Sequence, residues 1–184
     1  MRTAVNDKIY TVEEYIQEEL HSEIRHEFIN GQLIEMAGEK DTNNELAFLI
    51  ASLLFGLLKT KGYMVYSHDV KVAIPGGAKY YYPDVFLTKE IKTENNRYIK
   101  YQPEIVIEVV SESTHITDYI DKYIDYAKIQ SLNYYLIVEP DVILITVHER
   151  EDNNNWITHK YTQPDATVKL PKLNIEFLVK QVYE

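Results

Sequence analysis

The sequence predicts an α/β fold: a single domain over residues 1–184, with a mixed β-sheet flanked by α-helices. Three observations predict it. Apolar residues recur with helical spacing in some segments and alternate, or run on as Val and Ile, in others. Segment 104–138 has the order strand, helix, strand, which implies a right-handed parallel crossover. No linker, internal repeat or low-complexity segment divides the 184 residues, and 45% apolar residues suit one core.

The first elements have clear start and stop signals. Thr11 and Glu14 form a capping box that opens a helix at "YTVEEYIQEEL". Asn30-Gly31 separates two alternating runs and predicts a hairpin in "IRHEFINGQLIEM". An apolar stripe predicts a long helix over about residues 42–61, and Gly62 ends it.

The remaining elements are mostly strands. We expect strands at 63–66, 69–74 and 80–87, a polar surface connection at 88–101, and a strand at 104–110. A helix over about 115–129 follows, capped by Ser113 or Thr114. "NYYLIVEP" and "VILITVHER" are two further strands, "EDNNNW" is a turn, and Trp156 begins the last hairpin arm.

Composition excludes several classes of protein. There is no cysteine, so neither a disulfide framework nor a thiolate metal site can form. No apolar run reaches membrane-spanning length, and the N-terminus lacks the apolar core of a signal peptide. We therefore expect a cytoplasmic protein that does not enter the membrane. Walker, G-x-G-x-x-G and H-E-x-x-H motifs are absent.

Charge is unevenly distributed along the chain. The net charge of −10 argues against a general nucleic-acid binder. Residues 59–100, however, carry eight basic and four acidic side chains, among them Lys71, Lys79 and Lys100. This segment would attract a phosphate-bearing ligand. The alternative is that its lysines are ordinary solvated loop residues.

Two acidic residues stand in apolar β-rich runs. Glu108 lies inside "QPEIVIEVV", and Asp84 follows Pro83 in "YYYPDVFL". An ionised carboxylate in such a strand is costly unless a cation, a proton or hydrogen bonds compensate it. If both acids point to one side of adjacent strands, they form a hard-oxygen site for Mg²⁺ or Mn²⁺. The alternatives are a buried ion pair for Glu108 and backbone N–H partners for Asp84.

These segments resemble the PD-(D/E)XK nuclease superfamily, and more narrowly the Uma family of putative restriction endonucleases. The resemblance runs from about Tyr10 to Tyr161 and rests on an ordered set of segments. They are "RHEFINGQLIEMAG", "SHDVKVAI", "YYYPDVFL", "PEIVIEVVSEST", "DYIDKYIDY" and "SLNYYLIVEP". It implies a restriction-endonuclease-like sheet flanked by helices.

The resemblance assigns metal-ligand roles to specific residues. Asp84 and Glu108 would bind the metal, the backbone carbonyl of Val109 would complete the coordination, and Glu27 would lie near the metal. The alternative for Glu27 is a surface residue paired with Arg25. Asp69 matches a recurring family acid whose role is not assigned.

The lysine that usually follows two residues after the glutamate is replaced here by Val110. The resemblance implies that Lys122, on the next helix, takes its place. Asp118, Lys122 and Tyr126 are spaced to share one helix face. The alternative for Lys122 is an exposed pair with Asp118. Asn43 stands where relatives often have histidine.

The function implied is a Mg²⁺- or Mn²⁺-dependent endonuclease that hydrolyses phosphodiesters, with DNA as the expected substrate. Asp84, Glu108 and Lys122 would be its catalytic residues. A homodimer is a fold-level expectation for such an enzyme. The alternative function is an inactive nuclease-fold module that binds nucleic acid or a protein partner. The acidic chain and the missing motif lysine favour that alternative.

Overall fold

The computed structural model describes residues 4–36, 38, 40–94, 97–110 and 117–183. The helices are α1 (Val12–His21), α2 (Asp41–Leu58), α3 (Tyr123–Tyr126) and α4 (Lys180–Tyr183), with the short helical turns η1 (Lys59–Lys61), η3 (Thr117–Lys122) and η4 (Pro171–Leu173). The strands are β1 (His26–Ile29), β2 (Gln32–Glu35), β3 (Met64–Ser67), β4 (Lys71–Ile74), β5 (Lys79–Tyr81), β6 (Val85–Thr88), β7 (Ile99–Lys100), β8 (Pro103–Val109), β9 (Tyr134–Val138), β10 (Ile145–Arg150), β11 (Trp156–Tyr161), β12 (Thr167–Leu170) and β13 (Ile175–Leu178).

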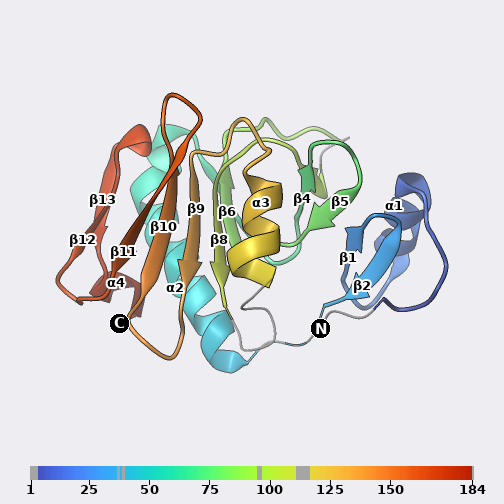
Figure 1. Ribbon diagram of the computed structural model, residues 1–184, viewed down its shortest axis with the longest axis horizontal. Coiled ribbons are helices and arrows are strands. Elements are labelled where there is room, and N and C mark those ends of the chain that lie inside the picture. The colour runs from blue at the N-terminus through green and yellow to red at the C-terminus, as the bar shows by residue number, and fades with distance from the viewer. Residues whose placement is uncertain (1–3, 37, 39, 95–96, 111–116, 184) are drawn as a thin grey trace.

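The larger sheet is mixed and covered on both faces. Its strand order is β11-β10-β9-β8-β6-β3. Strands β8 and β9 run parallel, as the strand–helix–strand order predicts, and the other neighbours are antiparallel. Helix α2 lies behind this sheet and α3 in front of it (Figure 1). The predicted α/β class, a mixed sheet flanked by helices, is confirmed.

Alternation along β6 and β8 decides which side chains meet which helix. Val85 and Ile107 belong to the apolar cluster on the α2 side. Phe86, Val106 and Val110 belong to the cluster that contains Tyr126 of α3. Because side chains alternate along a strand, Asp84 and Glu108 fall on the α3 side of the sheet.

A second sheet, which the sequence did not separate from the first, has the order β2-β1-β5-β4-β7. It lies beside the larger sheet, with α1 at its outer end (Figure 1). Its apolar cluster includes Tyr15 of α1, stacked at 4.9 Å between ring centroids on Phe28 of β1. The predicted capping box of Thr11 with Glu14 is present, and the β1–β2 turn has Asn30 at φ 51° and Gly31 at φ 89°.

The prediction of one continuous strand over residues 80–87 is wrong. The segment divides into β5, which joins the second sheet, and β6, which joins the larger one. The break falls at Pro83, which has no N–H to donate to a ladder. The same chain segment therefore connects the two sheets, and Asp84 stands at the connection.

Two further expectations are corrected. The connection at 88–101 contains strand β7, which pairs in parallel with β4 and buries Lys100. The hairpin arm that Trp156 begins is not the last, because β12 and β13 form another hairpin before α4. Strands β7, β12 and β13 are short, so the sequence pattern within each is too brief to predict a strand.

The helix predicted over about 115–129 is present over residues 117–126 and ends three residues before the predicted end. Residues 117–122 form a π-helical turn, which leads directly into α3. Ser113 and Thr114, the predicted caps, lie outside the described residues. Within the ranges that the structure describes, no helix has the length and apolar character needed to span a membrane.

Candidate active site

Asp84 and Glu108 occupy neighbouring positions on the α3 side of the larger sheet. Val85 pairs with Ile107, so one further step along this antiparallel ladder places Asp84 opposite Glu108. The Oδ2 atom of Asp84 accepts a hydrogen bond from the backbone N–H of Val109 at 2.6 Å. The carboxylate thus serves as an acceptor where the ladder ends beside Pro83, as the backbone alternative for Asp84 predicted.

Lys122 lies against Glu108 rather than in solvent. Its Nζ atom is 2.9 Å from Oε1 of Glu108, and only 4% of the residue is exposed. Tyr126, four residues on, donates its hydroxyl to the same oxygen at 3.1 Å. The alternative of an exposed Lys122 is therefore wrong. Lys122 and Tyr126 share one face of the helix, as predicted; the Asp118 side chain lies outside the description.

Glu27 reaches the same lysine from the second sheet. It is 3% exposed on β1, and its Oε1 atom lies 3.6 Å from Lys122 Nζ. The predicted alternative, a surface pair of Glu27 with Arg25, is wrong, because Arg25 Nε bonds the exposed Asp69 at 3.3 Å. The ammonium group of Lys122 thus contacts one acid from each sheet, although Glu27 and Glu108 are far apart in the sequence.

The site carries more negative than positive charge. Glu27, Asp84 and Glu108 are all buried, and Lys122 is the buried ammonium in contact with two of them. Burial, and then the charge of Glu108, raise the pKa of the Tyr126 hydroxyl well above its usual range, so it remains a neutral donor. Burial of these carboxylates is costly, and Lys122, Tyr126 and the backbone N–H of Val109 offset part of the cost.

The residues present fit a hard divalent cation in ligand type. Asp84 and Glu108 offer carboxylate oxygens, and Mg²⁺ typically takes one or two carboxylates together with waters and substrate phosphates. In the described part of the chain, no three His, Asp or Glu side chains are grouped so that they could hold a metal. The fit is therefore to a site with two carboxylates, in which a cation and Lys122 would compete for Glu108.

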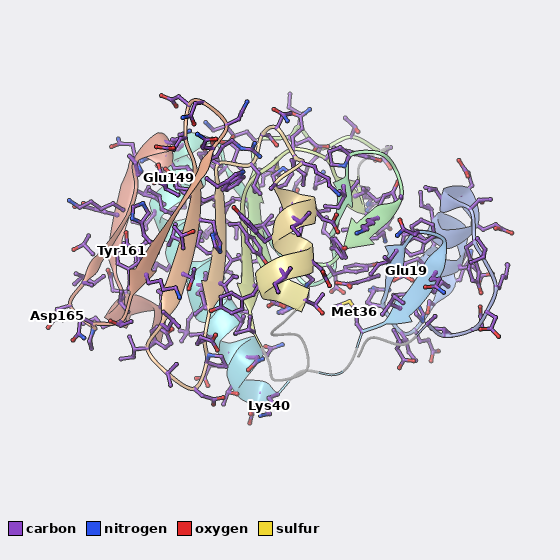
Figure 2. The ribbon with its side chains drawn as sticks, in the orientation of Figure 1. Glu19, Met36, Lys40, Glu149, Tyr161 and Asp165 are labelled. Carbon is purple, nitrogen blue, oxygen red and sulfur yellow. The ribbon has the colours of Figure 1, made fainter. Side chains whose placement is uncertain are left out.

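A second buried network, which no sequence signal indicated, supports the two acid-bearing segments. Glu19 of α1 accepts hydrogen bonds from the backbone N–H of His26 at 2.9 Å and from the Tyr82 hydroxyl at 2.7 Å. His26 immediately precedes Glu27, and Tyr82 stands two residues before Asp84. Figure 2 labels Glu19 at the end of the molecule formed by α1, β1 and β2. The Glu19 carboxylate therefore links strand β1, which bears Glu27, to the segment between β5 and β6, which bears Asp84.

Lys71 extends this network, and its position corrects the solvated-lysine alternative. It is 5% exposed, and its Nζ atom donates to the Tyr82 hydroxyl at 2.9 Å. Burial lowers the pKa of Lys71 to about 8, an effect that the charge of Glu19 partly offsets. Lys100 is also buried, so at least these two lysines of the basic segment are not solvated loop residues.

Asp125 forms a third polar cluster beside the site. It is 1% exposed and accepts hydrogen bonds from Lys79 at 2.5 Å, Lys128 at 2.7 Å and the Tyr81 hydroxyl at 2.7 Å. Burial opposes ionisation of this carboxyl, but the bonds from Lys128, Lys79 and Tyr81 outweigh it and lower its pKa. Tyr80, the neighbour of Tyr81, is buried as well.

Asn43 of α2 lies at the end of β8. It is buried in the first turn of α2, and its Nδ2 atom donates to the carbonyl of Val110 at 3.5 Å. The residue at the position where relatives often have histidine therefore ties α2 to the end of β8.

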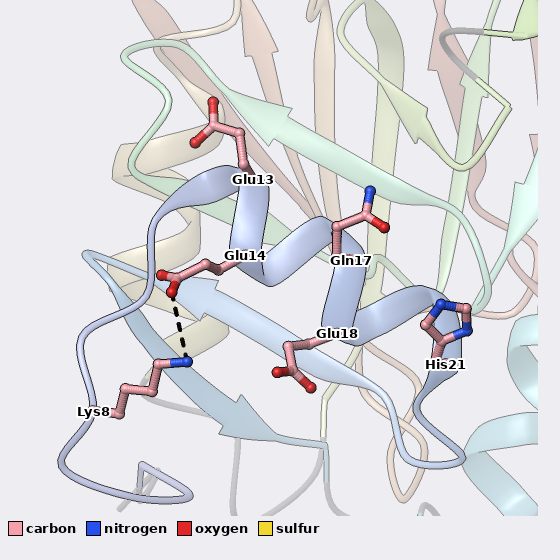
Figure 3. Close-up of a pocket in the computed structure, with 6 residues that line it drawn as sticks. All are labelled: Lys8, Glu13, Glu14, Gln17, Glu18 and His21. Carbon is pink, nitrogen blue, oxygen red and sulfur yellow. Dashed lines mark ion pairs between the residues drawn. The ribbon is translucent and has the colours of Figure 1, made fainter.

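A surface hollow on α1 is a poor alternative to this site. It is lined by Lys8, Glu13, Glu14, Gln17, Glu18 and His21 (Figure 3). Lys8 pairs with Glu14 at 3.7 Å, which leaves two further glutamates in an open and mainly acidic lining. Such a surface repels phosphate.

Comparisons with known proteins identify the family of this chain. A family model described as "Uma2: Putative restriction endonuclease" matches residues 12–179. Two uncharacterised proteins of Synechocystis, sll1609 and slr1290, are each 26% identical to this chain. The first alignment covers 95% of this chain and 100% of sll1609, and the second covers 93% and 90% of slr1290.

A solved structure shows the same fold. A crystal structure from Anabaena variabilis, titled as a putative nuclease belonging to DUF820, superposes with a TM-score of 0.77 at 17% identity. The superposition covers 94% of this chain and 97% of that one. At this identity the likeness shows the fold, and the family model shows membership: the chain belongs to the Uma2 family of putative restriction endonucleases.

Proposed function

We propose that this protein is a metal-dependent nuclease that hydrolyses phosphodiester bonds, with DNA as its substrate. The observation that carries the proposal is the position of Lys122. Its ammonium group lies between two buried carboxylates, at the end of the strand that bears Glu108. Family membership supports the same reaction class.

The reaction divides between a cation and the chain. A Mg²⁺ or Mn²⁺ ion held by Asp84 and Glu108 would polarise the phosphoryl oxygen and lower the pKa of a bound water. In hydrolysis, the water oxygen loses a proton and bonds to phosphorus, one phosphorus–oxygen ester bond breaks, and the departing oxygen takes up a proton. Lys122 carries a fixed positive charge beside this centre and offsets the negative charge that develops on the phosphoryl oxygens.

Tyr126 and Glu27 orient the lysine and its acid. The Tyr126 hydroxyl donates to Glu108 and holds that carboxylate in place at 3.1 Å. Glu27 lies 3.6 Å from the same ammonium group, so Lys122 has one carboxylate from each sheet beside it. A positioned, water-excluded charge is worth more in the transition state than a mobile one.

A second candidate function is an inactive nuclease-fold module that binds nucleic acid. Two observations favour it. Lys122 already compensates Glu108 at 2.9 Å, and the described residues hold no three-acid metal group. In this case, the lysine replaces the cation as the partner that makes the buried glutamate tolerable.

Cleavage assays with matched variants separate the two functions. We expect the wild type to cut labelled duplex or single-stranded DNA with Mg²⁺ or Mn²⁺ and to stop when a chelator is added. Asp84→Asn should abolish cleavage, whereas Asp69→Asn, which changes an exposed acid, should not. If DNA and RNA substrates stay intact with either metal, the nuclease proposal fails and the binding module replaces it.

A further inference from the structure

The cluster around Asp125 carries a net positive charge at the surface. Asp125 is buried, whereas 24% of the Lys79 side chain and 51% of the Lys128 side chain are exposed. Both ammonium groups bond the same carboxylate, one at each oxygen. We call Lys79 and Lys128 the lysine pair.

The geometry of the lysine pair suits the binding of an anion. Among the described residues, each ammonium group has one hydrogen bond, to Asp125. A lysine ammonium has three donors, so the groups retain donors on their exposed sides. The buried carboxylate holds the two charges together, and this removes part of the entropy cost of binding a ligand.

A purely structural role does not require both lysines. Lys79 comes from β5 in the second sheet and Asp125 from α3, so their ion pair joins the two parts of the fold. That one ion pair already neutralises the buried acid. Lys128, three residues along from Asp125, adds a second positive charge that the connection does not need.

The pair lies close to the candidate active site. Tyr81 connects the two, because its hydroxyl bonds Asp125 at 2.7 Å and its ring centre lies 5.9 Å from Lys122 Nζ. Asp125 also directly precedes Tyr126, which bonds Glu108. Successive phosphates on one DNA strand rise about 3.4 Å along the axis, so a strand that runs from Lys122 toward Tyr81 would bring a neighbouring phosphate to the pair.

We propose that Lys79 and Lys128 bind a backbone phosphate of nucleic acid, next to the phosphate that the active site acts on. The inference rests on the proposed nucleic-acid substrate, but the binding itself requires no cleavage. It also gives a role to part of the basic segment in this acidic protein. Contacts to the backbone carry no sequence information, so the pair contributes affinity and register rather than base specificity.

Salt dependence of binding provides the test. Fluorescence anisotropy would measure the affinity for a labelled 20-base-pair duplex and for one of its strands, with a chelator present and KCl varied. Each lost phosphate contact should reduce the slope of log affinity against log salt by about 0.9 for duplex and about 0.7 for single strands. Because both lysines contact one phosphate, we expect part of this loss in Lys128→Gln, and the whole loss of one contact when Lys79→Gln is added.

A matched control exists at the other end of the molecule. Lys180 is 39% exposed and pairs with Asp165 at 2.9 Å, and Figure 2 labels Asp165 at the far end from Glu19. Lys180→Gln should leave the slope unchanged, and Lys128→Arg should keep it near the wild-type value. Thermal melts would verify that each variant is folded.

The outcomes are separable from those of the proposed function. The inference is overturned if folded Lys128→Gln and the double variant keep the wild-type slope, or change it only as much as Lys180→Gln. It is also overturned if the wild type binds neither probe at low salt. If the slope falls as expected but no DNA is cleaved with Mg²⁺ or Mn²⁺, the phosphate site is supported and the nuclease proposal fails.

Discussion

Replacing Lys122 by methionine should destabilise the protein strongly when no metal is present. The side chain is buried and compensates two buried acids, Glu108 at 2.9 Å and Glu27 at 3.6 Å. Removing one partner of a buried ion pair leaves an uncompensated charge and costs about 3–5 kcal/mol. For a chain of this size, 1 kcal/mol shifts the melting temperature by about 2–4 °C, so we expect a fall of about 6–20 °C.

A divalent cation should reverse part of this loss. If Asp84 and Glu108 bind Mn²⁺, an ion at 100 times its dissociation constant stabilises the folded state by about 2.7 kcal/mol. The gain should be larger in Lys122→Met than in the wild type, because the lysine no longer competes for Glu108. Adding Glu108→Gln should remove the response to metal and relieve part of the destabilisation.

Urea unfolding followed by circular dichroism, with and without Mn²⁺, measures both effects. Lys8→Met is a matched control, because Lys8 and Glu14 form an ion pair at 3.7 Å with about half of each side chain exposed. Such a pair contributes about 0–1 kcal/mol. If Lys122→Met loses no more stability than this, the buried-pair reasoning is refuted. If Mn²⁺ stabilises Lys122→Met and the wild type equally, Lys122 does not compete with the metal for Glu108.

Two further predictions concern pH. Below pH 8, the buried Lys71 must be charged although its folded pKa of about 8 lies under the unfolded value, so stability should rise as pH increases above 8. Lys71→Met should lack that rise in urea unfolding at pH 7 to 9.5, and parallel curves for the two proteins would contradict this. Asp125 has a lowered folded pKa, so its contribution is present above the unfolded pKa and is lost as pH falls through the folded one. Asp125→Asn should therefore be less stable than the wild type at pH 7, with a difference that shrinks in acid; a difference independent of pH would show that its charge is not responsible.

Features that depend on neighbouring residues were predictable from the sequence. The capping box of Thr11 and Glu14 and the turn at Asn30-Gly31 formed as their local chemistry requires. The strand predicted at 104–110 formed as β8, and its apolar side chains are buried on both faces of the sheet. Helix periodicity placed Lys122 and Tyr126 on one face, because that spacing follows from the backbone itself.

Features that depend on distant partners were decided by the tertiary structure. The local pattern of "DYIDKYIDY" is the same whether Lys122 faces solvent or Glu108. Lys122 is buried only because its helix packs against β8. The division of segment 80–87 between two sheets, the bond of Glu19 to Tyr82 63 residues away, and that of Lys79 to Asp125 46 residues away have no local signal either. A buried charge is tolerated only where the folded chain brings its partner to it, so the sequence determined which acids needed partners and the fold determined which partners they have.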